Sequence, residues 1–257
     1  MRERCRARAR RSYAAPTMSD TLILLPGLVS DRAVWRPQCE ALAPRAHCHV
    51  PDWGLLDSLG AMAEHVLATA PAARFALAGH SMGGRVAFEV WRRAPERVER
   101  LALLDTSCHP RAAGAAGEAE REQRMRLLDL ARRDGMRALG RAWLPGMVHP
   151  RRIDTLLHDE LLAMVERSSP AQYAAQVAAL LARPDAEPLL GTIGCPTLLL
   201  CGRDDAWSPP ARHEHMHAAI AGSRLVVVDD CGHFAPVEQP DAVTSALADW
   251  MQSAPRI

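Results

Sequence analysis

The stretch Phe75–Phe88, FALAGHSMGGRVAF, decides the fold of this chain. A short apolar run ends in a glycine-rich turn around Ser81, and apolar residues at helical spacing follow it. This order predicts a strand, a tight turn and a helix, with a hydroxyl at the carboxyl edge of a sheet. Gly79 and Gly83 flank the turn and keep side chains out of its way. The helix start helps to stabilise an anion at this position. We therefore interpret Ser81 as a nucleophile, and an incidental serine in a turn is the alternative.

Further apolar segments on both sides of this stretch alternate with helical patterns. This alternation predicts an α/β fold, with a mostly parallel central sheet flanked by helices. The additional strands are expected at Thr21–Leu25, Cys48–Val50, Val98–Leu104, Thr197–Leu200 and Leu225–Val228.

The alternation is interrupted between residues 107 and 194, where amphipathic helical patterns replace strands. We expect a helical cap at 107–194, an α/β core made of 18–106 and 195–257, and an N-terminal extension at 1–17. The extension is rich in arginine and lacks the apolar centre of a secretory signal. A disordered extension, a misplaced start codon, an electrostatic tail and a targeting segment all remain open for it.

A serine hydroxyl is a weak nucleophile until a base takes its proton, so a histidine and an orienting acid are expected later in the chain. His233 follows the last expected strand, and Asp205 lies in the loop after Thr197–Leu200. The order serine, acid, histidine is the one that this kind of fold uses. Asp204 and Asp105 remain as alternative acids.

These motifs together resemble the α/β-hydrolase superfamily, in its serine-nucleophile, esterase-like branch. The matching pieces, spread over roughly residues 21–251, are LLPG, DWG, GHSMGG, APERVERLALLD, CGRDDAWSPP and CGHFAPVEQP. The resemblance implies that Ser81 is the nucleophile, that His233 is the general acid and base, and that Asp205 orients the imidazole.

The resemblance also implies an oxyanion hole formed by the backbone amides of Leu28 and Met82. Pro26-Gly27 stands here where the family usually has His-Gly before the oxyanion residue, and the loop after Asp52 is shortened. Trp207 and Phe234 flank the acid and base loops, so they either line the substrate pocket or pack these loops together.

Composition limits the partners and cofactors of the chain. The net charge is +1 and no apolar run approaches the ~18 residues of a membrane helix, so we expect neither nucleic acid nor membrane binding. The seven cysteines are scattered without a C-x-x-C pair, which favours a reducing cytoplasm and no structural disulfides. We expect no cofactor and no metal. The alternating histidines His213, His215 and His217 are interpreted as part of a solvated helix.

Residues 121–152 contain nine arginines and only three acidic residues. Such a basic surface would suit an acyl carrier protein or a CoA ester, and a solvated helical face in an arginine-biased chain is the interpretation that we favour.

The sequence thus predicts a serine hydrolase that cleaves small to medium carboxylic esters through an acyl-enzyme. A carrier-bound methyl ester esterase or thioesterase, an enol-lactonase and a carbon–carbon bond hydrolase are the enzymatic alternatives. A ligand receptor built on the hydrolase fold is the non-enzymatic one.

Overall fold

The computed structural model describes residues 20–253, so the expectations for the N-terminal extension lie outside the described residues. Its centre is a six-stranded sheet in the order β2-β1-β3-β4-β5-β6, and every neighbouring pair is parallel. This confirms the predicted α/β class. The strands are β1 (Thr21–Leu25), β2 (His47–His49), β3 (Phe75–His80), β4 (Val98–Leu104), β5 (Thr197–Gly202) and β6 (Arg224–Val228).

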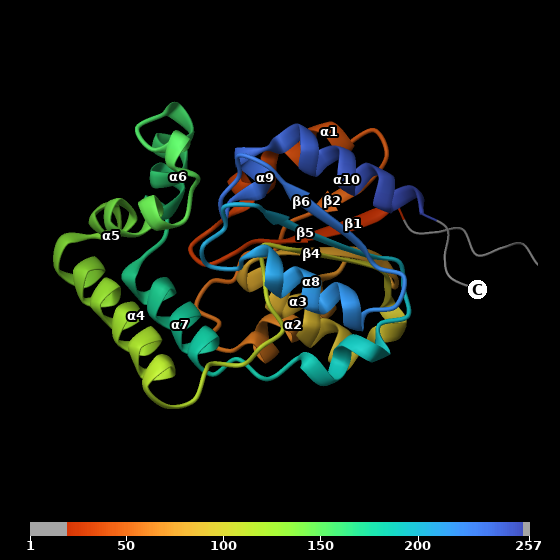
Figure 1. Ribbon diagram of the computed structural model, residues 1–257, viewed down its shortest axis with the longest axis horizontal. Helices are drawn as coiled ribbons and strands as arrows, with labels where there is room; N and C mark the ends of the chain where they lie inside the picture. Colours follow the sequence, from red (N-terminus) through yellow and green to blue (C-terminus); the bar gives the residue numbers. More distant parts are fainter. Residues whose placement is uncertain (1–19, 254–257) are drawn as a thin grey trace, which may run out of the picture.

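Helices cover both faces of the sheet (Figure 1). One face carries α1 (Arg36–Leu42), preceded by the 3-10 turn Arg32–Trp35, together with α9 (Ala235–Glu238) and α10 (Pro240–Gln252). The opposite face carries α2 (Leu59–Thr69), α3 (Met82–Arg93) and α8 (Pro210–Ala219). Strands β3, β4 and β5 are completely buried, which explains why their sequences are mostly apolar.

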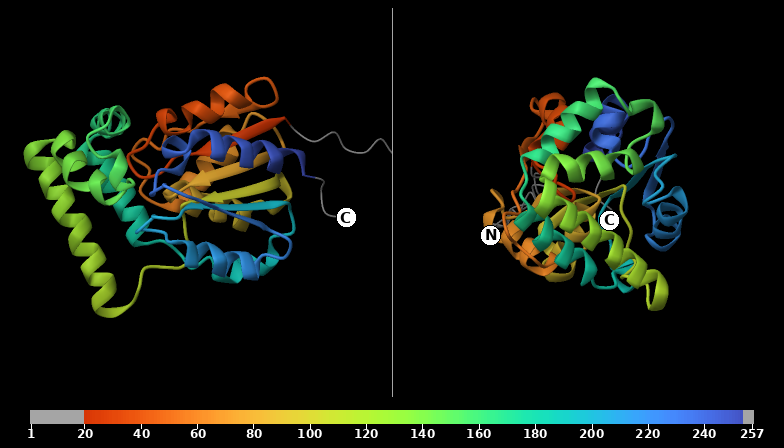
Figure 2. Two further views of the ribbon diagram at one scale, coloured as in Figure 1. Left: turned by 45° about the horizontal axis from the view of Figure 1, so that its top comes forward. Right: turned by 90° about the vertical axis from the view of Figure 1, so that its left-hand side faces the viewer.

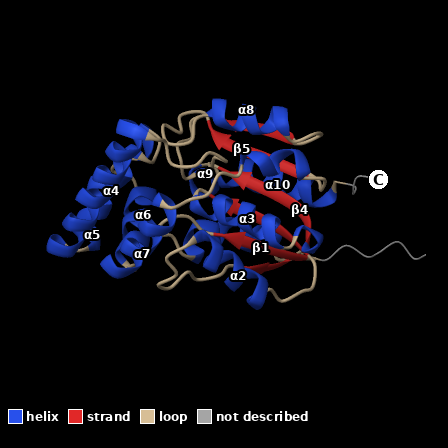
Figure 3. Cartoon of the chain, turned by 90° about the horizontal axis from the view of Figure 1, so that it is seen from below, coloured by secondary structure: helices blue, strands red, loops and turns tan. Residues whose placement is uncertain are grey.

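The segment between β4 and β5 forms four further helices: α4 (Gly114–Asp134), α5 (Met136–Trp143), α6 (Leu156–Glu166) and α7 (Pro170–Leu181). Figure 2 shows these helices gathered at one end of the molecule, off the faces of the sheet. In Figure 3 the strands point toward them, so they lie beyond the carboxyl ends of the strands. Short 3-10 turns connect them at Leu144–Gly146 and Pro150–Arg152, and Glu187–Thr192 leads back to β5.

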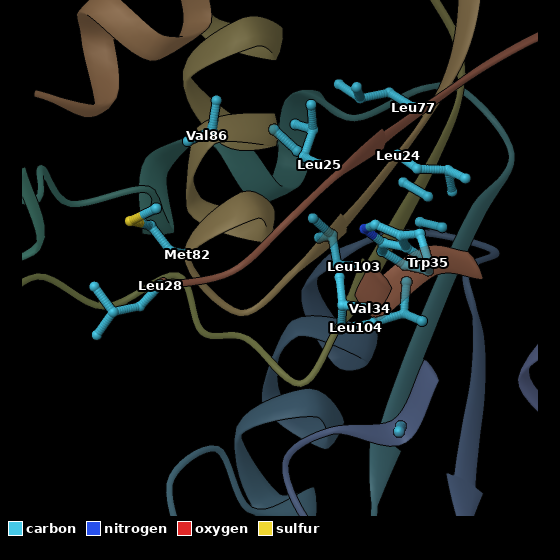
Figure 4. Close-up of a cluster of buried hydrophobic side chains, with 14 of the residues drawn as sticks. Leu24, Leu25, Leu28, Val34, Trp35, Leu77, Met82, Val86, Leu103 and Leu104 are labelled. Atoms are coloured by element: carbon cyan, nitrogen blue, oxygen red, sulfur yellow. The ribbon is translucent and has the colours of Figure 1, made fainter. Parts of the chain in front are cut away.

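Side chains from the strands and the covering helices form one continuous core. Figure 4 shows Leu25 beside Val86 of α3, whereas Leu24 points to the opposite face, where Trp35 lies. All four side chains are fully buried. In the described part of the chain, no helix combines the length and the hydrophobicity that crossing a bilayer requires.

Glycines let β3 and α3 approach β1 closely. A Cβ atom on Gly79 would lie 2.4 Å from the Gly83 carbonyl oxygen, and one on Gly83 would lie 2.2 Å from the Leu25 carbonyl oxygen. The structure therefore confirms that the flanking glycines keep side chains out of the turn. Helix α3 begins at Met82, directly after Ser81 in the turn.

We expect Gly83→Ala to lower the free energy of unfolding by at least about 2 kcal/mol, because the added methyl group overlaps a backbone oxygen. Urea unfolding measures the loss. Gly191→Ala is the matched control, since a Cβ there meets nothing within 4 Å, and its change should stay within about 0.5 kcal/mol. Equal stability of the two variants would contradict this account of the turn.

Candidate active site

Ser81 is the single residue between the end of β3 and the start of α3, and it forms a sharp turn. Its φ angle is 56° and its ψ angle is −115°, a backbone conformation that a residue with a side chain rarely adopts. The turn is held from β4, because the Ser81 amide donates to Leu104 O at 2.9 Å. The Thr106 hydroxyl donates to Ser81 O at 2.7 Å. The strained turn thus places the Ser81 hydroxyl beyond the carboxyl end of β3.

Ser81, His233 and Asp205 form a continuous hydrogen-bonded row. Ser81 Oγ lies 2.8 Å from His233 Nε2, and His233 Nδ1 lies 2.8 Å from Asp205 Oδ2. His233 and Asp205 are each 2% exposed, whereas Ser81 is partly exposed. The structure therefore brings together the three side chains that the sequence singled out, although they come from three separate loops.

The environment of Asp205 favours its ionised form. Its Oδ1 atom accepts hydrogen bonds from the amides of Trp207 and Ser208, both at 2.8 Å. Burial alone raises the pKa of this carboxyl, but the charge and hydrogen bond of His233, followed by the two amides, outweigh burial and hold the pKa below its usual range. Asp204, the neighbouring alternative, is 45% exposed and lies 3.7 Å from His149.

Asp105, the other alternative acid, occupies a different place. Its Oδ1 atom accepts from the Gly202 amide at 3.0 Å, and its Oδ2 atom lies 3.7 Å from His80 Nε2. Complete burial, followed by the nearby charge of Asp205, raises the pKa of Asp105 well above its usual value. His80 donates to His233 O at 2.7 Å, and burial followed by the neighbouring His233 lowers the pKa of His80 to about 3. Both shifts favour the uncharged forms of these two groups, which lie beneath the site.

Glu238 fixes the loop that carries His233. Its carboxylate accepts from the amides of Gly232, Phe234 and His149, at 3.1, 2.9 and 2.8 Å. The His233 amide itself donates to Met147 O at 2.7 Å. Because Met147 and His149 belong to the segment between β4 and β5, this segment helps to position the imidazole.

Leu28 and Met82 line the same cavity as Ser81. Figure 4 shows the two side chains next to each other, where the loop after β1 meets the start of α3. No hydrogen bond among the described residues uses either amide, so both can donate to another group. The next residue, Val29, has a φ angle of 45°, which is strained for a β-branched residue. Its amide donates to Gln176 Oε1 of α7 at 2.7 Å, which holds the loop in place.

A cavity of about 600 Å³ opens beside Ser81. Trp207 belongs to its wall, as the sequence suggested, and Trp143 and Met147 add apolar surface from the inserted segment. Phe234 does not line the cavity, although the sequence left that role open for it. Its side chain is 1% exposed and packs behind the wall, with its ring centroid 5.4 Å from that of His80 and 6.1 Å from that of Trp143.

Arginine side chains give this cavity a positive charge. Arg124 and Arg183 share the carboxylate of Glu120 at 2.9 and 2.7 Å, and Arg124 also lies over the Trp207 ring. Burial, followed by the other arginines, lowers the pKa of Arg85 to about 9, so its guanidinium stays charged at neutral pH. The cavity is also lined by Arg126 and Arg212. Five guanidinium groups thus line a cavity that contains few carboxylates.

The sequence interpretation of a solvated helix holds for His215 and His217 of α8, which are exposed, and is wrong for His213. His213 is fully buried and accepts from the Thr106 amide at 3.2 Å, because α8 packs on β5. His217 lies 2.8 Å from the Ser223 hydroxyl. His215 points elsewhere and lies 2.7 Å from Glu187. The three side chains therefore contact three separate groups.

Sequence reasoning missed Glu238, Gln176 and three arginines of the cavity, Arg85, Arg183 and Arg212, whereas Arg124 and Arg126 belong to the basic stretch that it considered. Glu238 was present in the quoted motif CGHFAPVEQP, and a buried acid five residues after the histidine is a detectable signal. Gln176 and Arg183 carry no such signal, because their place depends on how the inserted helices dock.

We expect Asp105→Asn to stabilise the protein at neutral pH by about 1–3 kcal/mol. The unfolded carboxyl loses its proton above a pH of about 3.9, whereas the folded one keeps it, so the wild type loses stability as the pH rises. Asparagine still accepts from Gly202. The gain should shrink toward zero near pH 4 in thermal unfolding from pH 4 to 8. Asp204→Asn, at an exposed side chain, is the control, and a gain that does not change with pH would argue against a protonated Asp105.

Comparison with known proteins agrees with this geometry. A family profile described as "Alpha/beta hydrolase family" matches residues 22–246. The pimeloyl-[acyl-carrier protein] methyl ester esterase of Nitrosomonas europaea is 29% identical over 240 residues, which cover 88% of this chain and 93% of that protein. A thermophilic esterase from Thermogutta terrifontis has a TM-score of 0.79 and 29% identity, over 91% of this chain and 90% of that one. The enol-lactonase of Burkholderia xenovorans has a TM-score of 0.78 and 25% identity, over 92% and 93% of the two chains. The chain therefore belongs to the alpha/beta hydrolase family and is a hydrolase.

Proposed function

We propose that this hydrolase cleaves carboxylic esters through an acyl-enzyme formed on Ser81. The observation that carries the proposal is the hydrogen-bonded row in which Ser81 Oγ and Asp205 Oδ2 each lie 2.8 Å from a nitrogen of His233. In this arrangement the imidazole can take the serine proton on Nε2 while Nδ1 remains bound to a carboxylate.

The reaction proceeds in two halves. Ser81 Oγ attacks the ester carbonyl carbon as its proton passes to His233 Nε2, and Asp205 stabilises the resulting imidazolium. The negative oxygen of the tetrahedral intermediate accepts from the amides of Leu28 and Met82. Such donors are worth about 3–4 kcal/mol each in other enzymes. His233 then protonates the leaving alcohol, and a water molecule that His233 activates releases the acid and restores the Ser81 hydroxyl.

The inserted segment acts as a cap in this proposal. Residues 107–194 form the cap, and 18–106 with 195–257 form the catalytic core. Trp143 and Met147 from the cap and Trp207 from the core line a cavity of about 600 Å³, which suits a small to medium acyl group.

The arginines indicate that the substrate carries a negative charge besides the ester. Arg85, Arg124, Arg183 and Arg212 line the cavity with Ser81, and Glu120 compensates for two of them. No carboxylate lies within salt-bridge distance of the Arg212 guanidinium in residues 20–253, so this group is available for a substrate carboxylate. We therefore propose a half-ester of a dicarboxylic acid, or an ester with a similarly placed anion, as the preferred substrate.

Initial rates on p-nitrophenyl esters from acetate to decanoate test the reaction. Ser81→Ala should lower kcat/KM by at least about 10⁴-fold, because the nucleophile is lost. Ser168→Ala, at a serine just before α7, is the matched control and should retain the wild-type rate. A peak at short chains is expected from the cap. Unchanged activity of Ser81→Ala would refute the acyl-enzyme mechanism.

The charge preference is tested with two esters of equal acyl length, mono-p-nitrophenyl glutarate and p-nitrophenyl valerate. We expect the charged ester to have at least a tenfold higher kcat/KM. Arg212→Gln should lower that value about tenfold for the charged ester alone, which corresponds to about 1.4 kcal/mol. Arg132→Gln, on the exposed side of α4, should change neither rate. Equal losses on both esters would show that Arg212 does not recognise the anion.

A carrier-bound methyl ester is the second candidate substrate. It is favoured by the similarity to the pimeloyl-[acyl-carrier protein] methyl ester esterase of Nitrosomonas europaea over 88% of this chain. The basic surface of the cap, in contrast, is partly neutralised by ion pairs, among them Arg126 with Glu122, Arg133 with Asp134 and Arg137 with Glu166. Turnover of a carrier-bound methyl ester, with no turnover of the free half-ester, would identify this second substrate class.

A further inference from the structure

Four potential metal ligands meet where the inserted segment joins the core. Cys108 and His109 follow β4, Glu187 begins the last 3-10 turn before β5, and His215 lies on α8. One ligand atom from each residue lies within 4.8 Å of those of the other three. The wall of the cavity beside Ser81 is built from other residues, so this cluster is separate from the candidate active site.

Glu187 is at the centre of the cluster. Its Oε2 atom accepts from Cys108 Sγ at 3.1 Å, and its Oε1 atom lies 2.7 Å from His215 Nε2. His109 Nε2 lies 4.0 Å from Glu187 Oε2, while the other nitrogen of this ring lies 3.1 Å from the Ser107 hydroxyl. Such a bond to the second ring nitrogen is the usual support of a metal-bound imidazole.

We propose that Cys108, His109, Glu187 and His215 bind a divalent transition metal ion, with Zn²⁺ as the preferred ion. One thiolate, two imidazoles and one carboxylate are a tetrahedral zinc set, and the sulfur and nitrogen donors disfavour Mg²⁺ and Ca²⁺. Zinc bonds of about 2.1–2.3 Å place neighbouring ligand atoms roughly 3.3–3.8 Å apart. The four atoms therefore need to close by only about 1 Å at their widest separation.

The surroundings favour both access and binding. Cys108 is 1% exposed, whereas the side chains of His109, Glu187 and His215 are 47%, 40% and 46% exposed, so an ion can enter from solvent on one side. Binding of Zn²⁺ to the Cys108 thiol breaks the S–H bond, forms a zinc–sulfur bond and releases one proton to water. The thiolate and the carboxylate then balance the charge of the ion.

The backbone around the cluster is already held in place. The Ala186 amide donates to Cys108 O at 2.9 Å, so a hydrogen bond joins the loop that leaves the core to the loop that returns to it, beside the ligands. Arg85 donates to His109 O at 2.8 Å. In Figure 1 both connections pass on the side of the sheet that carries α8. A bound ion would thus connect the two ends of the inserted segment to α8.

Metal titration of protein without an affinity tag, after removal of ions with a chelator, tests the proposal. We expect one equivalent of Zn²⁺ per chain, and Co²⁺ should give an absorption band that reports a cobalt–thiolate bond. Zn²⁺ should also raise the unfolding temperature, since it binds the folded state. These readouts measure binding and do not depend on the proposed esterase reaction.

Substitutions of the proposed ligands test whether these residues bind the ion. Cys108→Ser should abolish the cobalt–thiolate band, and His215→Ala should weaken zinc binding by more than about 100-fold, which exceeds the usual effect of losing an outer-shell partner. His215 is nearly half exposed, so its variant remains informative if the buried Cys108→Ser variant fails to fold. The controls are Cys48→Ser on the edge strand and His217→Ala on the same helix as His215, and both should bind like the wild type. Absence of stoichiometric zinc in the wild type, or wild-type binding by His215→Ala, would overturn the proposal.

Discussion

The left-handed backbone conformation of Ser81 is the constraint on which the rest of the structure depends. A residue with a side chain holds such a conformation only when its surroundings fix it, because the conformation itself is unfavourable by about 1–3 kcal/mol. Here the fixing comes from two directions. Hydrogen bonds to Leu104 and Thr106 hold the turn from β4, and the contact of Gly83 with Leu25 seats α3 on β1. The compact core is therefore also what keeps one hydroxyl exposed at the sheet edge.

Two buried carboxyl groups at the same edge have pKa values that are shifted in opposite directions for physical reasons. Asp205 accepts two amide hydrogen bonds and faces an imidazole, so ionisation is favoured despite burial. Asp105 accepts from the Gly202 amide, but its complete burial and the nearby charge of Asp205 favour its protonated form. The environment thus favours a negative charge on Asp205, the group that is bonded to His233. That charge is placed where the proposed mechanism develops a positive one.

The sequence predicted the order of strands and helices well, because apolar periodicity and glycine-rich turns are local features. It also selected Ser81, Asp205 and His233, since each follows a strand at the same sheet edge. The sequence did not predict contacts between residues that are far apart in the chain. Gln176 reaches Val29 from 147 positions away, and Arg183 reaches the cavity only because α7 docks beside α4. The cluster around Glu187 was missed for the same reason: its ligands come from three segments, and His215 was considered only with its neighbours on α8.

The inserted segment helps to hold two loops of the proposed active site and also forms part of the pocket wall. Gln176 holds the loop that carries the Leu28 amide, and Met147 and His149 hold the loop that carries His233. The same segment supplies Arg124 and Arg183 to the cavity. An anion that draws these two guanidinium groups inward would therefore act on the helices that position both loops. In the proposed mechanism, substrate recognition and the alignment of the proposed oxyanion donors with the imidazole therefore depend on the same inserted segment. On that proposal, the bond from the Val29 amide to Gln176 supports the site, because it holds the residue next to Leu28.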